Sequence, residues 1–433
     1  MRRDVNLYWC GETASSFGSV FTAIALPVVA LTELGATAGQ VGLISAASTV
    51  PGIVLGLLAG ALADRIERPR RAMILMDLLS AASVAAVALA LRHGVASIVW
   101  LMGLGLVQGL LGVLLGSLYF VHLRQLVGAE AIGPVRARLQ AGQFGAALVG
   151  RILAGPVIAL FGSAVALGTD AVSYLLSALA LLSMRSPDRA AAVPETAGQK
   201  REGVRGAAAG LRFFAGHPFH RALLLFIVAP AAAMTGVATL TGPFLLRTVH
   251  LPVGVYGLAF VLSGVMGLTG SALAGRLLRP GRDARLTVLV CFAAALASLI
   301  PLPVAAGPLP LAVFCAALGL GLPVLFGAVA NVALVSVLAT DVPEAMMGRG
   351  MAALQVIMSA TALAGALAGG YLGDLLGVRT ALWALIGTGL LVVGAVGPAA
   401  VRAARDLRAR DEQEQKPAPD APDVAEAGPA AAV

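Results

Sequence analysis

Three charged residues, Glu12, Arg151 and Asp170, lie inside long apolar segments of this 433-residue chain. A charge near the centre of a membrane helix costs roughly 2.5–3.5 kcal/mol on insertion scales, so such residues are candidates for function. Arg151 lies in the middle of one apolar segment and Asp170 lies early in the next. Because a long Arg side chain can bridge the small difference in depth, we predict a pair or near-pair between them. Three roles stay open for it: stabilisation alone, coupling of protons or anionic cargo, and extension of Arg151 toward lipid headgroups.

Glu12 belongs to a polar stripe on the first apolar segment. Glu12, Ser16 and Ser19 fall on one helical face, with Ser15 and Thr22 alongside. A polar stripe on a membrane helix predicts a water-filled cavity rather than lipid on that side. A partly dry cavity would favour the protonated carboxyl group, which makes Glu12 a candidate proton carrier. The alternative is a hydrated residue in a vestibule.

Further polar residues in the apolar segments are candidates for lining the same cavity. They are Gln108, Gln143, Thr235, Asn331 and Gln355. The alternative for each is a hydrogen bond that holds two helices together.

Membrane helices must position these residues, because 59% of the chain is hydrophobic and only 12% is charged. A helix needs about 20 apolar residues to span the hydrocarbon core. The apolar runs lack two-residue alternation and are too long for strands. The sequence therefore predicts an all-α polytopic membrane protein. Its twelve expected transmembrane helices cover about 7–31, 40–63, 72–91, 97–121, 139–161, 164–184, 220–246, 254–275, 285–303, 310–338, 350–373 and 379–400.

The net charge of +8 comes from arginines in short loops between apolar runs, which excludes nucleic acid as an expected partner. Lys and Arg concentrate in cytoplasmic loops of membrane proteins. When the N-terminus is placed in the cytoplasm, only Arg92, Arg247 and Arg379 fall on the opposite side, and Arg151 lies within a span. We therefore expect both termini to be cytoplasmic.

The chain contains an internal repeat. The segment ALADRIERPRR at 61–71 returns as ALAGRLLRPGR at 272–282. Repeats of this kind predict two pseudo-symmetric six-helix bundles. The expected parts are an N-terminal bundle at 1–184, a cytoplasmic linker at 185–219, a C-terminal bundle at 220–402 and a disordered tail at 403–433.

Glycines recur every four residues on one face of the second span and of the eleventh. They are Gly52, Gly56 and Gly60, and Gly365, Gly369 and Gly373. Such ridges predict close contact between these two spans. Asp64, at the end of the second span, would then rest against the positive N-terminus of the eleventh and latch the halves together. Alternatively, the arginines around it only orient the chain.

The segment GALADRIERPRR, together with STVPGIVLGLLAGALADR, TDAVSYLLSALAL and VPEAMMGRGMAALQ, resembles the major facilitator superfamily. Within it the chain is similar to the bacterial branch that includes macrolide and enterobactin exporters, over about residues 5–400. Gly60, Asp64, Arg65 and Arg68 look like the superfamily's signature between spans two and three. The resemblance implies that this signature gates the exchange of inward-open and outward-open states, with Arg68 paired to an acid such as Asp77.

Two departures from the family pattern concern charged residues. Ser80 stands where relatives often carry arginine, which leaves Asp77 fewer partners. In the segment GRILAG at 150–155, Arg151 takes the position of a proline that relatives associate with antiport. This replacement suggests a binding role for Arg151.

The resemblance implies a secondary transporter in the bacterial cytoplasmic (inner) membrane that exports small amphipathic compounds in exchange for protons. There are two alternatives. The protein could import a metabolite, or it could be a non-transporting membrane sensor with the same fold. The sequence contains no Walker loop, nucleophile constellation or metal-ligand spacing, so neither an enzyme nor a cofactor is expected. The expected partners are a small-molecule cargo, protons and membrane lipid, and the expected state is a monomer.

Overall fold

The computed structural model describes residues 2–55, 66–186, 212, 216, 218–277, 283–341 and 344–414. Twelve helical segments in it are long and apolar enough to cross a membrane. The predicted all-α architecture with twelve spans is therefore confirmed. The segments are Arg3–Glu33, Ala38–Leu55, Pro69–Arg92, Ile98–Tyr119, Arg138–Phe161, Ser163–Leu182, His220–Thr248, Val253–Leu277, Ala284–Val304, Leu309–Leu338, Ala353–Leu376 and Val378–Ala409.

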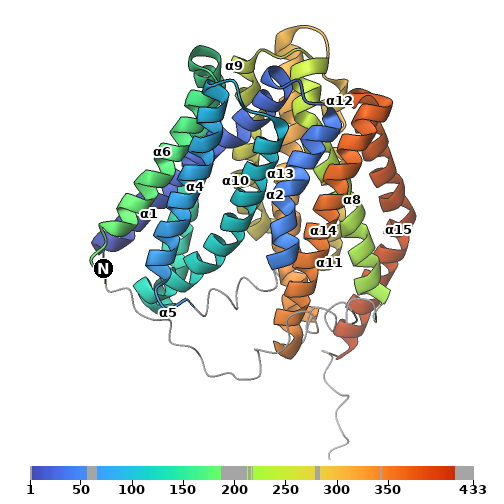
Figure 1. Ribbon diagram of the computed structural model, residues 1–433. Helices are drawn as coiled ribbons and strands as arrows, with labels where there is room; N and C mark the ends of the chain where they lie inside the picture. Colours follow the sequence, from blue (N-terminus) through green and yellow to red (C-terminus); the bar gives the residue numbers. More distant parts are fainter. Residues whose placement is uncertain are drawn as a thin grey trace, which may run out of the picture.

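The first half of the chain forms a group of helices in which α1 packs on α5 and α6, and α4 packs on the same two helices. Pro69 begins α4, where its missing N–H costs no hydrogen bond. Figure 1 shows α1, α4 and α6 together on one side of the molecule. The elements are α1 (Arg2–Val28), η1 (Val29–Glu33), α2 (Ala38–Leu55), α4 (Pro69–Arg92), α5 (Ile98–Phe161) and α6 (Ser163–Leu182).

The long element α5 contains the fourth and fifth spans, with helical backbone where the sequence predicted a loop. The hydroxyl of Tyr8 donates to the carbonyl of Tyr119, and the indole of the next residue, Trp9, donates to that of Arg138. A straight helix between Tyr119 and Arg138 would be about 28 Å long. Because both ends contact neighbouring residues of α1, the chain must turn back between them.

The second half packs in the same manner: α13 contacts α10 and α11, and α8 contacts α14 and α15. Figure 1 places α8, α14 and α15 on the side opposite α1, α4 and α6. The elements are α8 (Pro218–Pro243), η3 (Phe244–Thr248), α9 (Val253–Tyr256), η4 (Gly257–Phe260), α10 (Val261–Leu277), α11 (Ala284–Ala297), α12 (Pro301–Val304), α13 (Leu309–Asp341), α14 (Glu344–Leu376) and α15 (Val378–Glu414).

The last helix is longer than predicted. The expectation of a disordered tail from residue 403 is wrong for 403–414, because α15 continues to Glu414. Ala400 and Ala404 are fully buried, and they pack in a cluster with residues of α8, α11 and α13. Packing of these alanines against the neighbouring helices stabilises α15 beyond the end of its apolar run. Residues 415–433 and most of the linker at 185–219 lie outside the described residues.

The first helix of each half ends in the same way. Both α1 and α8 continue into a five-residue π-helical turn, η1 and η3 respectively. A proline, Pro27 or Pro243, precedes each turn closely, and proline removes a donor from the regular helical ladder. This shared ending supports the expected duplication.

We call the end of the bundle that carries the start of α1 the near face, and the opposite end the far face. At the far face, one hydrophobic core contains residues of both halves. Val28 and Leu31 from the first half belong to it, as do Leu240 and Phe244 from the second. The two halves are therefore joined there by continuous apolar packing.

At the near face, each half has a core of its own. Leu118 and Leu181 belong to a cluster built only from the first half, and Leu223 and Val337 to a cluster built only from the second. The halves therefore share their packing at the far face and pack separately at the near face.

Candidate functional site

A cavity of about 210 Å³ lies between the start of α1 and the two spans of α5. Its wall includes Tyr8, Glu12, Tyr119, Arg136, Gln140 and Gln143, and we call it the Glu12 cavity. Glu12 is only 8% exposed. Its Oε2 accepts a hydrogen bond of 2.6 Å from Nε2 of Gln143. The structure thus brings two predicted residues, Glu12 of α1 and Gln143 of α5, into direct contact toward the near face.

The rest of the polar stripe on α1 does not face this cavity. Ser19 shares a hydrogen bond of 3.3 Å with the hydroxyl of Tyr174, and Thr22 donates to Oδ2 of Asp170. Both partners belong to α6, and Ser16 is half-buried. Ser19 and Thr22 therefore hold α1 against α6, and the aqueous stripe through them stays a prediction.

Gln108 extends this hydrogen-bonded chain. The hydroxyl of Tyr174 donates to its Oε1, and its Nε2 donates to Oγ of Ser83, both at 3.3 Å. Asp170, which accepts from Ser173 at 3.2 Å, is buried at the other end of the chain. These contacts connect four helices of the first half, as expected of residues that hold helices together.

The predicted pair between Arg151 and Asp170 is wrong. Nη1 of Arg151 instead donates to the carbonyl of Phe260 at 3.3 Å and to Oγ of Ser263 at 3.1 Å. The acceptors lie at the end of η4 and near the start of α10, in the second half. Gly264 leaves the necessary space, since a side-chain carbon there would lie 2.9 Å from the guanidinium. Arg151 therefore connects the two halves.

The other predicted cavity residues make local contacts or are exposed. Thr235 donates to the carbonyl of Ala231 in its own helix at 2.9 Å. Gln355 donates to Ser359 at 3.5 Å, and Asn331 is exposed. These contacts do not indicate a role in cargo binding for Thr235, Gln355 or Asn331.

Part of the predicted gating signature can be located. Gly56, Gly60, Asp64 and Arg65 lie outside the described residues. The expected pair of Arg68 with Asp77 is wrong, because Arg68 is exposed whereas Asp77 is 1% exposed. Neither carboxylate oxygen of Asp77 has a hydrogen-bond partner among the described residues, although the hydroxyl of Ser177 lies close.

Glu12, Asp77 and Asp170 give the first half an acidic interior. All three are buried, and none forms an ion pair within the described part of the chain. They do not gather into a metal site, since no group of three potential ligands occurs among the described residues. Uncompensated carboxylates in a membrane helix are groups that can bind a cation or a proton.

The glycine ridges pair differently from the prediction. A carbon added to Gly369 would lie 2.6 Å from the carbonyl of Gly236, so this ridge packs on α8, as does Gly365. Gly373 contacts both α8 and the start of α2. Gly52 approaches only the hydroxyl of Ser359, at 3.7 Å.

The close contact of α2 with α14 lies at the far face instead, and uses other glycines. A carbon on Gly42 would lie 2.8 Å from the carbonyl of Ala366, and one on Gly370 would lie 2.9 Å from that of Ala38. The predicted pairing of spans two and eleven is therefore present, but with another set of small residues.

Two charged side chains at the far face were missed by the sequence analysis. Oδ2 of Asp374 accepts from the hydroxyl of Thr37 at 2.8 Å and from the N–H of Gly39 at 3.0 Å. Arg247 donates to the carbonyls of Leu31 and Ala36. These hydrogen bonds all join the two halves: Asp374 contacts the start of α2, and Arg247 contacts backbone carbonyls of the first half. The sequence marks both residues only as charges at span ends.

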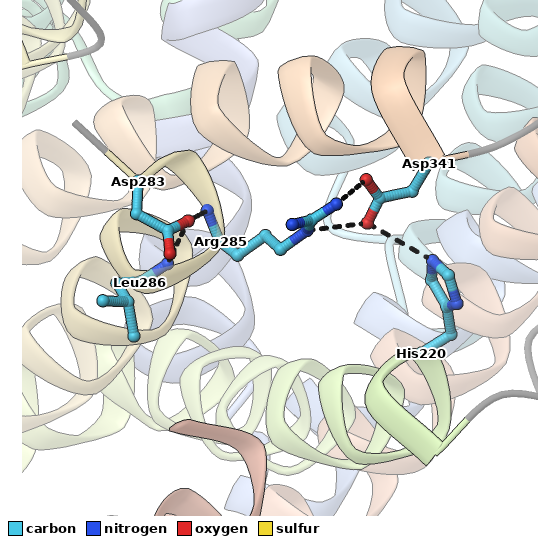
Figure 2. A network of polar contacts seen from close by, with 5 residues as sticks. All are labelled: His220, Asp283, Arg285, Leu286 and Asp341. Carbon is cyan, nitrogen blue, oxygen red and sulfur yellow. Dashed lines mark hydrogen bonds and ion pairs between the residues drawn. The ribbon is translucent and has the colours of Figure 1, made fainter. Parts of the chain in front are cut away.

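A buried network at the near face was also missed (Figure 2). Asp341 accepts from Nη2 of Arg285 at 2.6 Å and from its Nε at 3.0 Å, and lies 3.6 Å from Nε2 of His220. Asp283 caps α11 by accepting from the N–H of Arg285 at 2.8 Å. The network ties α8, α11 and α13 together at one end of the second half.

The sequence profile described as Major Facilitator Superfamily matches residues 8–337. The chain belongs to the major facilitator superfamily. This superfamily member is similar to the "Multidrug efflux pump Tap" of Mycolicibacterium fortuitum, with 27% identity over 384 residues, 85% of this chain and 88% of the relative.

Solved structures of transporters have the same fold as this major facilitator superfamily protein. A crystal structure of the nucleoside transporter NupG, in a mutant form, superimposes with a TM-score of 0.75 at 14% identity, covering 92% of this chain and 99% of that one. A bacterial homologue of the iron transporter ferroportin, in an inward-facing state, gives 0.68 at 15% identity, with 93% and 99% covered. At these identities the likeness concerns the fold alone.

Proposed function

We propose that this protein is a secondary active transporter that exports small amphipathic compounds in exchange for protons. The two halves rock about a site between them, which opens alternately to the near and far faces. The observation that carries the proposal is the uneven packing of the halves: one shared core at the far face and two separate cores at the near face. The similarity to a multidrug efflux pump favours export of this class of cargo.

Buried acids in the first half are the proposed coupling groups. Glu12 lines a cavity, and Asp170 lies deeper, between α1 and α6. A carboxylate in this setting can take up a proton on one side of the membrane and release it on the other. Arg151 connects the halves and is the proposed link between proton uptake and their movement.

We further propose that the transporter is a monomer in the bacterial inner membrane with both termini in the cytoplasm, so that the near face is cytoplasmic. The proposed units are a bundle at 1–184, a linker at 185–219, a second bundle that extends from 220 past the predicted boundary at 402 to the end of α15, and a tail after it.

Efflux measurements test the function. Cells that express the protein should accumulate less of at least one compound from a panel of drugs and siderophores than cells with an empty vector. A protonophore should abolish the difference, because it dissipates the proton gradient. Unchanged accumulation of every compound would contradict export, and efflux that survives the protonophore would contradict proton coupling.

The proposed gate is tested by Asp64→Asn. Removing the charge should lower efflux at least fivefold while leaving the amount of protein in the membrane unchanged, because it would remove the contact proposed between Asp64 and the N-terminus of the eleventh span. Glu67→Gln, an exposed acid in the same loop, is the matched control and should retain efflux. Equal efflux by the two variants would reduce Asp64 to an orientation signal.

A further inference from the structure

We propose that Arg151 binds the anionic end of the cargo, and that the cargo is an amphipathic molecule with a carboxylate or another oxyanion at one end. This inference rests on the proposed transport function, and it adds the chemical class of the cargo and the group that recognises it. Four features of Arg151 support it: its available donors, its uncompensated charge, its position between the halves and the apolar surface beside it.

One nitrogen of the Arg151 guanidinium holds the side chain in place. Nη1 donates to the carbonyl of Phe260 at 3.3 Å and to Oγ of Ser263 at 3.1 Å. Nε and Nη2 have no hydrogen-bond partner among the described residues, and neither is a fully buried atom. These two nitrogens form one edge of the planar guanidinium, and such an edge can bind both oxygens of a carboxylate. The anchored side chain therefore presents a two-pronged donor to an incoming anion.

The protein does not balance the charge of Arg151. Both acceptors of Nη1 are neutral, and no acid forms an ion pair with this half-buried residue in the part of the chain that the structure describes. Asp170, the acid expected to pair with it, accepts instead from Thr22 and Ser173. An unpaired charge in the membrane interior is costly. An anionic ligand would supply the missing counter-charge.

Arg151 lies between the halves, at the near-face edge of the core that they share. Ala154 and Ile158 follow it at helical spacing on the same side of α5, are 0% and 5% exposed, and belong to that core. Ile152 points elsewhere and is 42% exposed. Arg151 is also about 15 Å from Phe161, the far-face end of its span, so it lies deeper than lipid headgroups. Transporters of this architecture bind cargo at such a depth, between their repeats.

Apolar side chains lie next to Arg151 on the side toward the near face. Leu148 and Phe144 precede it by one and two turns on the same side of α5. Phe144 is 41% exposed, and Leu148 reaches α10, where it lies 3.4 Å from the position of a carbon added to Gly264. A cargo that holds its carboxylate against Arg151 would have its apolar body beside these side chains. An amphipathic anion satisfies both parts of the site.

A pair of matched probes tests the anion site: 4-phenylbutyrate, which is ionised at neutral pH, and its uncharged amide 4-phenylbutyramide. Binding to the purified full-length protein in phosphatidylcholine nanodiscs is measured by titration calorimetry, with empty nanodiscs subtracted. We expect the wild type to bind the carboxylate about tenfold more tightly than the amide. Arg151→Gln should lose about tenfold in affinity for the carboxylate, whereas its affinity for the amide should change little. Arg151→Lys keeps the charge but loses the two-pronged donor, so its affinity for the carboxylate should lie between the two.

Arg92→Gln removes an exposed arginine from the end of α4 and is the matched control, with wild-type binding expected. Equal affinity of the wild type for the two probes, binding of neither probe, or unchanged carboxylate binding by Arg151→Gln would overturn the anion site. If Arg151→Gln does not fold, phenylglyoxal modification of wild-type Arg151, mapped by mass spectrometry, replaces it. The carboxylate, and not the amide, should then slow the modification, and equal modification with both probes would overturn the site.

A lipid phosphate is the other oxyanion that Arg151 could meet. Native mass spectrometry of the protein released from the nanodiscs distinguishes it from cargo. We expect the wild type and Arg151→Gln to retain the same number of phospholipids. An additional phospholipid on the wild type alone would assign Arg151 to a lipid headgroup and overturn the cargo site.

The binding result is independent of the transport assay. Selective carboxylate binding without efflux of any compound would retain the anion site and refute the transport proposal. Efflux of neutral compounds together with equal binding of the two probes would do the reverse.

Discussion

Asp341 is a single carboxylate on which three helix ends depend. Its side chain is 4% exposed, accepts two hydrogen bonds from Arg285 and faces His220 of α8 (Figure 2). Arg285 is itself only 14% exposed, so its guanidinium has lost most of its water. Removing one partner of a buried ion pair leaves an uncompensated charge, which destabilises a protein far more than loss of an exposed pair.

Asp341→Asn is therefore expected to destabilise the second half by about 3 kcal/mol. Its midpoint of thermal unfolding in detergent should fall by several degrees, whereas efflux per folded molecule should change little. Asp406→Asn removes an exposed acid from α15 and should unfold like the wild type. A midpoint equal to that of the control would mean that the network contributes little to stability.

Individual residues were predicted better than their partners. The cost of a membrane-embedded charge singles out Glu12, Arg151 and Asp170 from the sequence alone. Depth along the helices suggested that Arg151 pairs with Asp170, but rotation about the helix axes and the approach of α10 decide the contact, and neither can be read from one sequence. Asp77 illustrates the same limit, since the resemblance gave it a partner that the structure does not provide.

The start of α2 is a helix terminus that takes part of its cap from the other half of the protein. Thr37 and Gln40 form a capping box: the N–H of Thr37 donates to Oε1 of Gln40 at 2.9 Å, and the N–H of Gln40 donates to the hydroxyl of Thr37 at 3.2 Å. Asp374, at the end of α14, accepts hydrogen bonds from the N–H of Gly39 and from the hydroxyl of Thr37. A carboxylate at a helix N-terminus is also favoured by the helix dipole. This contact stabilises the closed far face.

Asp374→Ala should therefore open the far face more often. Loss of a capping side chain costs about 1 kcal/mol, which corresponds to roughly a fivefold shift in the ratio of open to closed states. The measurement is the rate at which an impermeant maleimide labels Ala36→Cys, a fully buried far-face position, after Cys10, Cys291 and Cys315 have been replaced.

The labelling rate should rise about fivefold in Asp374→Ala. Asp406→Ala, on the exposed surface of α15, is the control and should label at the rate of the parent protein. An unchanged rate in Asp374→Ala would show that apolar packing alone closes the far face.

Elements were predicted well where composition determines them. Apolar runs predicted all twelve spans, because a helix must be long and apolar enough to cross the hydrocarbon core. The ends were less predictable. The π-turns η1 and η3, and the continuation of α15 past residue 403, depend on packing against other helices, which leaves no hydropathy signal. The box formed by Thr37 and Gln40 is a sequence signal that could have placed the start of α2.

At the scale of the whole molecule, the packing of the halves is uneven. They share one core at the far face, with Arg151, Arg247 and Asp374 adding hydrogen bonds between them, and they have separate cores at the near face. The repeat in the sequence predicted two halves. It could not predict which face is closed, because the same chain must adopt both arrangements in an alternating-access transporter.

A cross-link at the far face tests whether the two halves must separate there. The side chains of Thr37 and Asp374 approach within 2.8 Å, both residues are exposed, and they belong to different halves. Thr37→Cys with Asp374→Cys, in a background without the three native cysteines, should form a disulfide under mild oxidation. The cross-linked protein should lose efflux to the level of the empty vector and regain most of it after reduction, because the far face cannot open while the bond holds. Each single cysteine variant should be unaffected by oxidant. Full efflux by the cross-linked protein would mean that cargo passes without separation of α2 from α14, and rocking of the halves about this contact would have to be abandoned.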